Sequence, residues 1–439
     1  MSKYKFVAIG VLMGSLQLSS FAWSDSLEQV VKQALDNHPQ TLVELKKVQI
    51  RKEKINNALS GYWPTLDIDM GVGGQKRWLP PSQQTSPTTT HDNSYTRKEG
   101  TISLKQNLFS GFSTQKSVEE ARHLASVEAY ERNSNLEGLA LKVTTAYMNV
   151  LESLELMKLS KSNVMFHDDT YKKIKKKKES GVVGSSDLIQ IEVKRARSKA
   201  NFVNSRLNLE YARANYYSLV GAVVAEELLP PNVAKLQIPK SFSDALKISR
   251  NEHPDVIKAD YKIQAAEAYY ASQKSRYLPK LDLEIDQSWK TNVDGQQDTT
   301  ENLVAMARIS YNLFRGGADL SLVKESAYMV EESRAEKEAI LRMLEEKLQR
   351  AWDNYELITV EIGYLRQQEL SAKELVESYV KQFLIGKKDL LDLLDAKNEL
   401  FEASKNLITS TYADSLSRYE ILASLGQLSK EFNLAWNDE

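Results

Sequence analysis

The chain has 439 residues, and its 58 Lys and Arg against 59 Asp and Glu give a formal net charge of -1. This balance argues against a nucleic-acid partner, which would select a basic surface. There is no Cys, so the chain can form neither a disulfide framework nor a thiolate metal site. An exported fold of this composition has to be held together by packing.

The N-terminus reads as a secretory signal peptide over residues 1–24. Lys3 and Lys5 precede the apolar stretch 6–18, and Ala22-Trp23-Ser24 offers a small-x-small cleavage site. The apolar stretch is shorter than the roughly 20 residues of an ordinary membrane-spanning helix. We therefore predict an exported chain that loses this segment.

The remaining sequence is a duplication. Asn37-His38-Pro39 matches Glu252-His253-Pro254, and further matches join Tyr62-Trp63-Pro64-Thr65-Leu66-Asp67 to Tyr277-Leu278-Pro279-Lys280-Leu281-Asp282, and Asn107-Leu108-Phe109-Ser110-Gly111 to Asn312-Leu313-Phe314-Arg315-Gly316. Self-similarity of this kind is the signature of a repeated supersecondary unit. We predict a first repeat over 25–229, a linker over 230–240 and a second repeat over 241–439.

Each repeat contains two segments in which apolar and polar residues alternate, as in strands. The segments lie at about 62–73 and 100–109 in the first repeat, and at about 277–290 and 303–314 in the second. Strands of about ten residues with one apolar and one polar face are typical of a transmembrane barrel, although hairpins packed on a soluble core show the same pattern. Four strands cannot close a barrel, so a spanning chain must oligomerise; three copies, giving twelve strands, are favoured over two.

The rest of each repeat is predicted to be a long helical hairpin, at about 112–220 and 318–425. Proline is absent between residues 88 and 229 and after residue 279, which permits helices of about 65 residues, on the order of 100 Å long. Leucines at heptad spacing, Leu393, Leu400 and Leu407, indicate coiled-coil packing. A solid rod or bundle would explain this spacing as well as a tunnel.

The segment from Gln382 to Leu400 resembles the second hairpin tip of TolC-family outer-membrane exit ducts, and most closely the branch that serves type I secretion. With the repeat and the strand motifs, the resemblance covers nearly the whole chain after the signal peptide. It implies a mainly α fold with a β-barrel part: a homotrimer with a twelve-stranded barrel in outer-membrane lipid and an α-helical tunnel through the periplasm. A periplasmic adaptor and an inner-membrane transporter of the ABC type would be its partners.

The resemblance also implies a gate at the hairpin tips. Asp392 and Asp395 are three apart on a predicted helix and match the family's selectivity ring; six carboxylates around a threefold pore would attract cations. Phe383 and Lys388 occupy the positions of the family's latch, with Ser186 and Asp187 opposite. Adaptor docking is expected at the two turns, through Gly181, Gly184, Ser185, Leu188, Gly386, Lys387, Asp389 and Leu390.

A lysine tract precedes the first turn: Lys172, Lys173, Lys175, Lys176, Lys177 and Lys178. Cations suit a helix C-terminus, so this tract reads either as a solvated helix end or as an adaptor-docking patch. The sequence is compatible with both interpretations.

Catalytic and metal chemistry find no support in the sequence. The five histidines, His38, His91, His123, His167 and His253, lack metal-ligand spacing, and there is no phosphate loop or nucleophile elbow. We expect no enzyme activity and no cofactor. The predicted function is a passive duct for protein export by type I secretion; the alternatives are a drug or metal efflux channel and, from another class, a periplasmic scaffold or adaptor that does not span the membrane.

Overall fold

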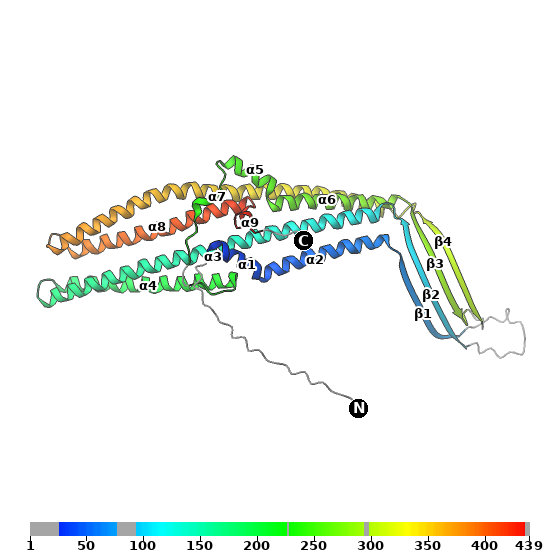
Figure 1. The fold of residues 1–439 in the computed structure, drawn as a ribbon, viewed down its shortest axis with the longest axis horizontal. Coiled ribbons are helices and arrows are strands. Elements are labelled where there is room, and N and C mark those ends of the chain that lie inside the picture. Colours follow the sequence, from blue (N-terminus) through cyan, green and yellow to red (C-terminus); the bar gives the residue numbers. More distant parts are fainter. Residues whose placement is uncertain (1–25, 77–93, 226–227, 294–297, 435–439) are drawn as a thin grey trace, which may run out of the picture.

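The computed structural model describes residues 26–76, 94–225, 228–293 and 298–434. Long helices run side by side over most of the length, and a four-stranded sheet forms one end (Figure 1). The predicted signal peptide lies outside the described residues.

Nine α-helices are present in the described residues. They are α1 Leu27–Asn37, α2 Pro39–Leu59, α3 Ser113–Glu179, α4 Ser185–Val220, α5 Phe242–Glu252, α6 Pro254–Lys274, α7 Ala318–Leu384, α8 Leu390–Ser424 and α9 Leu428–Glu431. α3 and α7 have 67 residues each, which corresponds to about 100 Å at 1.5 Å per residue. Helices that long were expected from the proline-free tracts. Among the described helices, none combines the length and hydrophobicity that crossing a membrane requires.

The two His-Pro pairs have the same structural role in both halves of the chain. His38 precedes α2 and His253 precedes α6, and in each the imidazole Nδ1 accepts a hydrogen bond at 3.1 Å from the backbone N–H two residues on. Proline then takes the first helical position, where a backbone N–H would have no acceptor within the helix, so its absence costs no hydrogen bond. Each pair therefore ends one helix and begins the next.

The sheet is antiparallel with strand order β1-β2-β3-β4, formed by β1 Thr65–Lys76, β2 Ser94–Phe109, β3 Lys280–Thr291 and β4 Thr299–Ser310. β1 and β3 begin three residues later than predicted, because Ser60–Tyr62 and Ser275–Tyr277 form 3-10 turns and the prolines that follow cannot donate to a ladder. β2 begins earlier than predicted, and β4 ends four residues earlier, at Ser310.

The register separates the two faces of this sheet. Asp67 pairs with Ser103 and Asp282 with Arg308, so charged and polar side chains share one face. Leu66 and Met70 lie on the other face and are 64% and 83% exposed. The outer edges of β1 and β4 have no strand partner within the described chain. A bare apolar face and two open edges need covering by lipid or by further strands.

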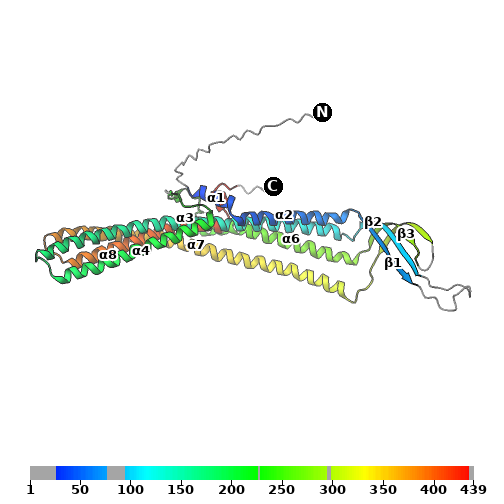
Figure 2. The same cartoon turned by 90° about the horizontal axis from the view of Figure 1, so that it is seen from below.

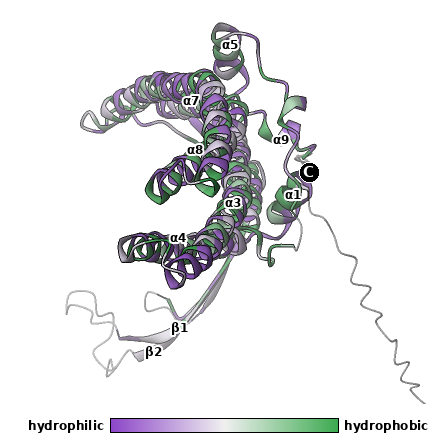
Figure 3. Ribbon diagram, turned by 90° about the vertical axis from the view of Figure 1, so that its left-hand side faces the viewer, coloured by the Kyte–Doolittle hydropathy of each residue, from purple (hydrophilic) through white to green (hydrophobic). Residues whose placement is uncertain are grey.

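The main core lies near the middle of the molecule. It joins α1, α3, α4 and α9 through fully buried side chains such as Val30, Leu136, Tyr147 and Leu428. Seen along the long axis, the long helices follow an arc, and α1, α5 and α9 lie on its outer side (Figure 3). Such an arc is compatible with part of a solid bundle and also with one section of a tunnel wall.

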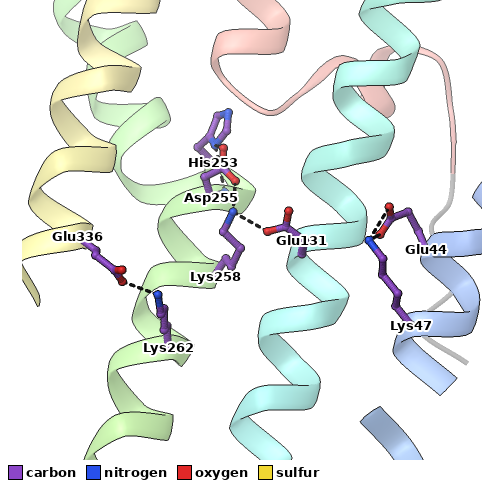
Figure 4. A network of polar contacts seen from close by, with 8 residues as sticks. All are labelled: Glu44, Lys47, Glu131, His253, Asp255, Lys258, Lys262 and Glu336. Atoms are coloured by element: carbon purple, nitrogen blue, oxygen red, sulfur yellow. Dashed lines mark hydrogen bonds and ion pairs between the residues drawn. The ribbon is translucent and has the colours of Figure 1, made fainter. Parts of the chain in front are cut away.

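Between this core and the sheet, α2, α3, α6 and α7 lie side by side, in that order (Figure 2). Ion pairs join neighbouring helices there (Figure 4). Lys258 on α6 reaches Glu131 on α3 at 2.8 Å, in addition to Asp255 on its own helix at 2.7 Å, and Lys262 pairs with Glu336 on α7. These ion pairs hold together helices that connect the core to the sheet.

Candidate gate at the hairpin ends

The two long hairpins turn in the same way at the end far from the sheet. Gly181 and Gly386 have φ values of +73° and +74°, the left-handed region that glycine adopts without strain. The N–H of Val182 donates to the carbonyl of Lys177, and that of Lys387 to Gln382, both at 2.9 Å. This is the Schellman arrangement, which satisfies carbonyls at a helix end.

A small apolar cluster joins the two hairpins of one chain. Ile174 on α3, Ile191 on α4, and Leu390 and Leu394 on α8 are each no more than 5% exposed. Phe383, Leu188, Phe166, Tyr171 and Val183 pack against them. The hairpin ends are therefore held together by hydrophobic burial, which the sequence analysis did not predict.

Both predicted selectivity carboxylates form ion pairs inside the chain. Asp392 Oδ2 lies 3.2 Å from Lys388 Nζ, one helical turn away, and Asp395 Oδ1 lies 2.8 Å from Lys194 Nζ on α4. The side chains of Asp392 and Asp395 remain 45% and 59% exposed. The hydrogen bond to Asp392 raises the pKa of Lys388.

The predicted latch residues contact other side chains of the same chain. Lys388 pairs with Asp392 and lies 4.7 Å from the Tyr379 ring centroid, and no contact between Lys388 and Asp187 forms within the described chain. The reason is local: Lys388 lies in the second turn, four residues before Asp392, which is in the first turn of α8. Phe383 packs in the apolar cluster and receives the Lys177 ammonium 4.7 Å from its ring centroid.

The residues expected to dock an adaptor fall into two groups. Gly184 and Asp389 occupy the N-cap positions of α4 and α8, and the others that are exposed beside them are Gly181, Ser185, Gly386 and Lys387. Leu390, by contrast, is buried in the apolar cluster, and Leu188 is partly buried there. The exposed apolar side chains of the turns are instead Val182, Leu384 and Ile385, which sequence reasoning missed.

A polar stretch of the α3 seam lies beyond the apolar cluster. His167 is 4% exposed, and its Nδ1 is buried without a hydrogen-bond partner. Burial, followed by the ammonium groups of Lys397 and Lys194, lowers the pKa of His167 to about 4, and Asp168 acts against this shift. Its heptad spacing from Ile174 is the signal that could have placed it in the seam.

Metal and cofactor sites were not expected, and the described residues contain no group of three or more His, Asp or Glu side chains that could hold a metal ion. The arrangement at the hairpin ends offers charge pairs, an apolar cluster and two exposed turns.

Fold and hairpin ends together define an elongated helical protein with a small membrane-type sheet. A sequence model of the family described as Outer membrane efflux protein matches residues 30–222 and again 245–427, one match for each repeat. The chain therefore belongs to this family, which confirms the predicted family membership, and it is an outer-membrane protein of the exit-channel type.

Relatives match over nearly the full length. The outer membrane efflux protein BepC of Brucella suis is 21% identical, covering 97% of this chain and 91% of the relative. The outer membrane protein TolC of Vibrio cholerae is 23% identical, covering 94% and 93%. The alkaline protease secretion protein AprF of Pseudomonas aeruginosa is 22% identical, covering 86% and 80%.

Among solved structures, the channel protein CusC has the same fold, with a TM-score of 0.79 at 14% identity over 91% of each chain. The predicted mainly α fold with four strands per chain is thereby confirmed.

Proposed function

We propose that three copies of this chain form a gated outer-membrane duct, with a twelve-stranded barrel and a helical tunnel across the periplasm. The observation that carries the proposal is the sheet, with two open edges and an apolar face that includes Leu66 and Met70. A closed ring of strands removes both edges, and lipid covers that face. A periplasmic scaffold that does not span the membrane would leave this surface in water.

The gate is proposed at the hairpin ends. Asp392 and Asp395 would form the selectivity ring, and Ser186, Asp187, Phe383 and Lys388 would contribute the gate contacts. The apolar cluster and the Lys194–Asp395 pair support a closed end in which the two hairpins of each chain lie together. The duct would be passive and without enzymatic activity, since transport energy would come from the inner-membrane transporter.

Protein export by type I secretion is the favoured cargo route, with an ABC transporter and a periplasmic adaptor. The second hairpin, Gln382 to Leu400, and the similarity to a protein named for alkaline protease secretion support this route. Efflux of drugs or metal ions is the second candidate, supported by the family description and by similarity to efflux protein BepC.

Planar-bilayer recording tests the duct. Purified protein should give a small, long-lived, cation-selective conductance; well-folded oligomers without conductance would contradict it. Cargo is tested in a cell that lacks its own exit duct. Restored protein secretion without restored drug resistance would support type I secretion, and the reverse result would support efflux.

A further inference from the structure

The lysine tract at the end of α3 is largely without partners. Lys173 pairs with the exposed Asp169 at 2.7 Å, and Lys177 lies over Phe383. Within the part of the chain that the structure describes, the other four lysines of the tract form no ion pair: Lys172, Lys175, Lys176 and Lys178. The helix C-terminus favours such cations, but like charges one helical turn apart repel each other, and an anionic partner would relieve that repulsion.

The second turn adds to the same charge. Lys381 and Lys387 are exposed beside Gly386 and likewise have no ion pair among the described residues. The carboxylates nearby are fewer: Glu179, Asp187 and Asp389 lie in the turns, while Asp392 and Asp395 are already paired with lysines. The hairpin ends therefore carry a cationic collar, which we define as these six unpaired lysines.

Apolar side chains are also exposed in and beside the two turns. Val182 in the first turn is 69% exposed, and Leu384 and Ile385 at the second are 65% and 67% exposed. Exposed apolar side chains favour a protein partner, because burial of apolar surface drives most protein–protein association. A polyanionic polymer or a lipid headgroup would use the lysines and would have no use for these side chains.

From the collar and these exposed apolar side chains we infer that the hairpin ends dock a protein whose contacting tip carries both acidic and apolar side chains. This inference rests on the proposed function and specifies the chemistry of the periplasmic partner. A second copy of this chain meeting end to end is disfavoured, because it would bring two cationic collars together. The outer-membrane surface is out of reach, since α3 places about 100 Å between the sheet and the collar.

Charge and apolar contacts should affect binding in different ways. Rim charges steer encounter, so they raise the association rate and make it sensitive to salt. Buried apolar anchors mainly slow dissociation. Separate measurement of the two rates therefore distinguishes an interface from simple charge attraction.

The test uses full-length protein in lipid nanodiscs and a helical peptide with leucine along one face and glutamate on both flanks. We expect binding at low salt that weakens as salt is added. Replacing Lys172, Lys175, Lys176 and Lys178 with Gln should slow association by roughly tenfold, whereas Val182→Ser with Ile385→Ser should speed dissociation. A peptide with glutamine in place of glutamate should bind no better to the wild type than to the lysine variant.

The matched control replaces four other exposed lysines that have no ion pair among the described residues, Lys52, Lys54, Lys158 and Lys161, with Gln. It changes net charge equally and should leave both rates unchanged. Equal binding by the two lysine variants, or binding of phosphatidylglycerol vesicles in place of the peptide, would overturn the inference. Single-channel conductance of the same preparations separates this result from failure of the duct proposal.

Discussion

The ammonium Nζ of Lys194 on α4 lies 2.8 Å from carboxylate Oδ1 of Asp395 on α8. One residue of the predicted selectivity ring thus also joins the two hairpins of its own chain. A gate that opens by separating the hairpins has to break this pair, and opening would release the carboxylate into the pore. Selectivity and closure are then linked through one side chain.

Lys194→Gln should raise closed-state conductance. An exposed ion pair contributes about 0.5 kcal/mol. If the three copies open together, losing one such pair in each copy would lower the closed-to-open ratio by roughly tenfold. Planar-bilayer recording at low salt measures the shift, which should shrink at high salt because surface charges are screened.

The double variant Lys194→Asp with Asp395→Lys restores opposite charges and should recover the low closed-state conductance. Lys199→Gln is the matched control, because Lys199 pairs with Asp168 at 3.4 Å between α3 and α4 of one hairpin. A swap variant that leaks as much as the single variant would remove this pair from the gate.

Replacing Asp392 and Asp395 together with Asn should lower the ratio of cation to anion permeability towards one. The carboxylates would otherwise concentrate cations at the narrow end of the pore. Asp36→Asn with Glu331→Gln removes the same charge from exposed sites far from the turns and should leave the ratio unchanged. Unchanged selectivity in the Asp392 and Asp395 variant would place the ring elsewhere.

Much of the fold could be predicted from the sequence because its signals are local. Proline-free tracts and heptads predicted the hairpins within a few residues, and alternation predicted the four strands. The strand starts were misplaced because Tyr62 and Tyr277 fit the alternation, while Pro64 and Pro279 delay hydrogen bonding to the ladder.

The contacts of the candidate gate were harder to predict because they depend on how helices rotate against each other. Spacing placed Asp392 and Asp395 on one face of α8, but it could not show that Lys194 lies opposite. Leu390 was expected at a docking surface and is buried instead, since it packs against Ile174 and Ile191 with Leu394. Its apolar i,i+4 spacing to Leu394 was the available signal.

Leu394→Ala should loosen the hairpin ends. Leu394 is fully buried, and a buried Leu→Ala change costs about 2–5 kcal/mol through lost burial and the cavity left behind. Hydrogen exchange should show faster exchange in both turns, and trypsin should cleave faster at the lysine tract. Leu391→Ala, at a 46% exposed position, should change stability by less than about 0.5 kcal/mol. Equal protection in the two variants would contradict a structural role for the cluster.

Acid should loosen the same region through His167. The unfolded side chain takes up a proton near its ordinary pKa of 6.5, whereas the buried one does so only near about 4. Between these two pH values the unfolded state binds more protons than the folded state, by at most one proton. The contribution of His167 to the free energy of unfolding is therefore lost as the pH falls from about 6.5 to about 4. Lys194 and Lys397 face the imidazole and would repel its charged form; Asp168 would attract it.

His167→Gln should therefore flatten the pH dependence of hydrogen exchange in the α3, α4 and α8 segments around the seam. His123→Gln, on the same helix but outside the seam, is the control and should leave that dependence as it is in the wild type. If the wild-type turns keep the same protection from pH 6.5 to pH 4, the buried imidazole does not set the acid sensitivity of this end.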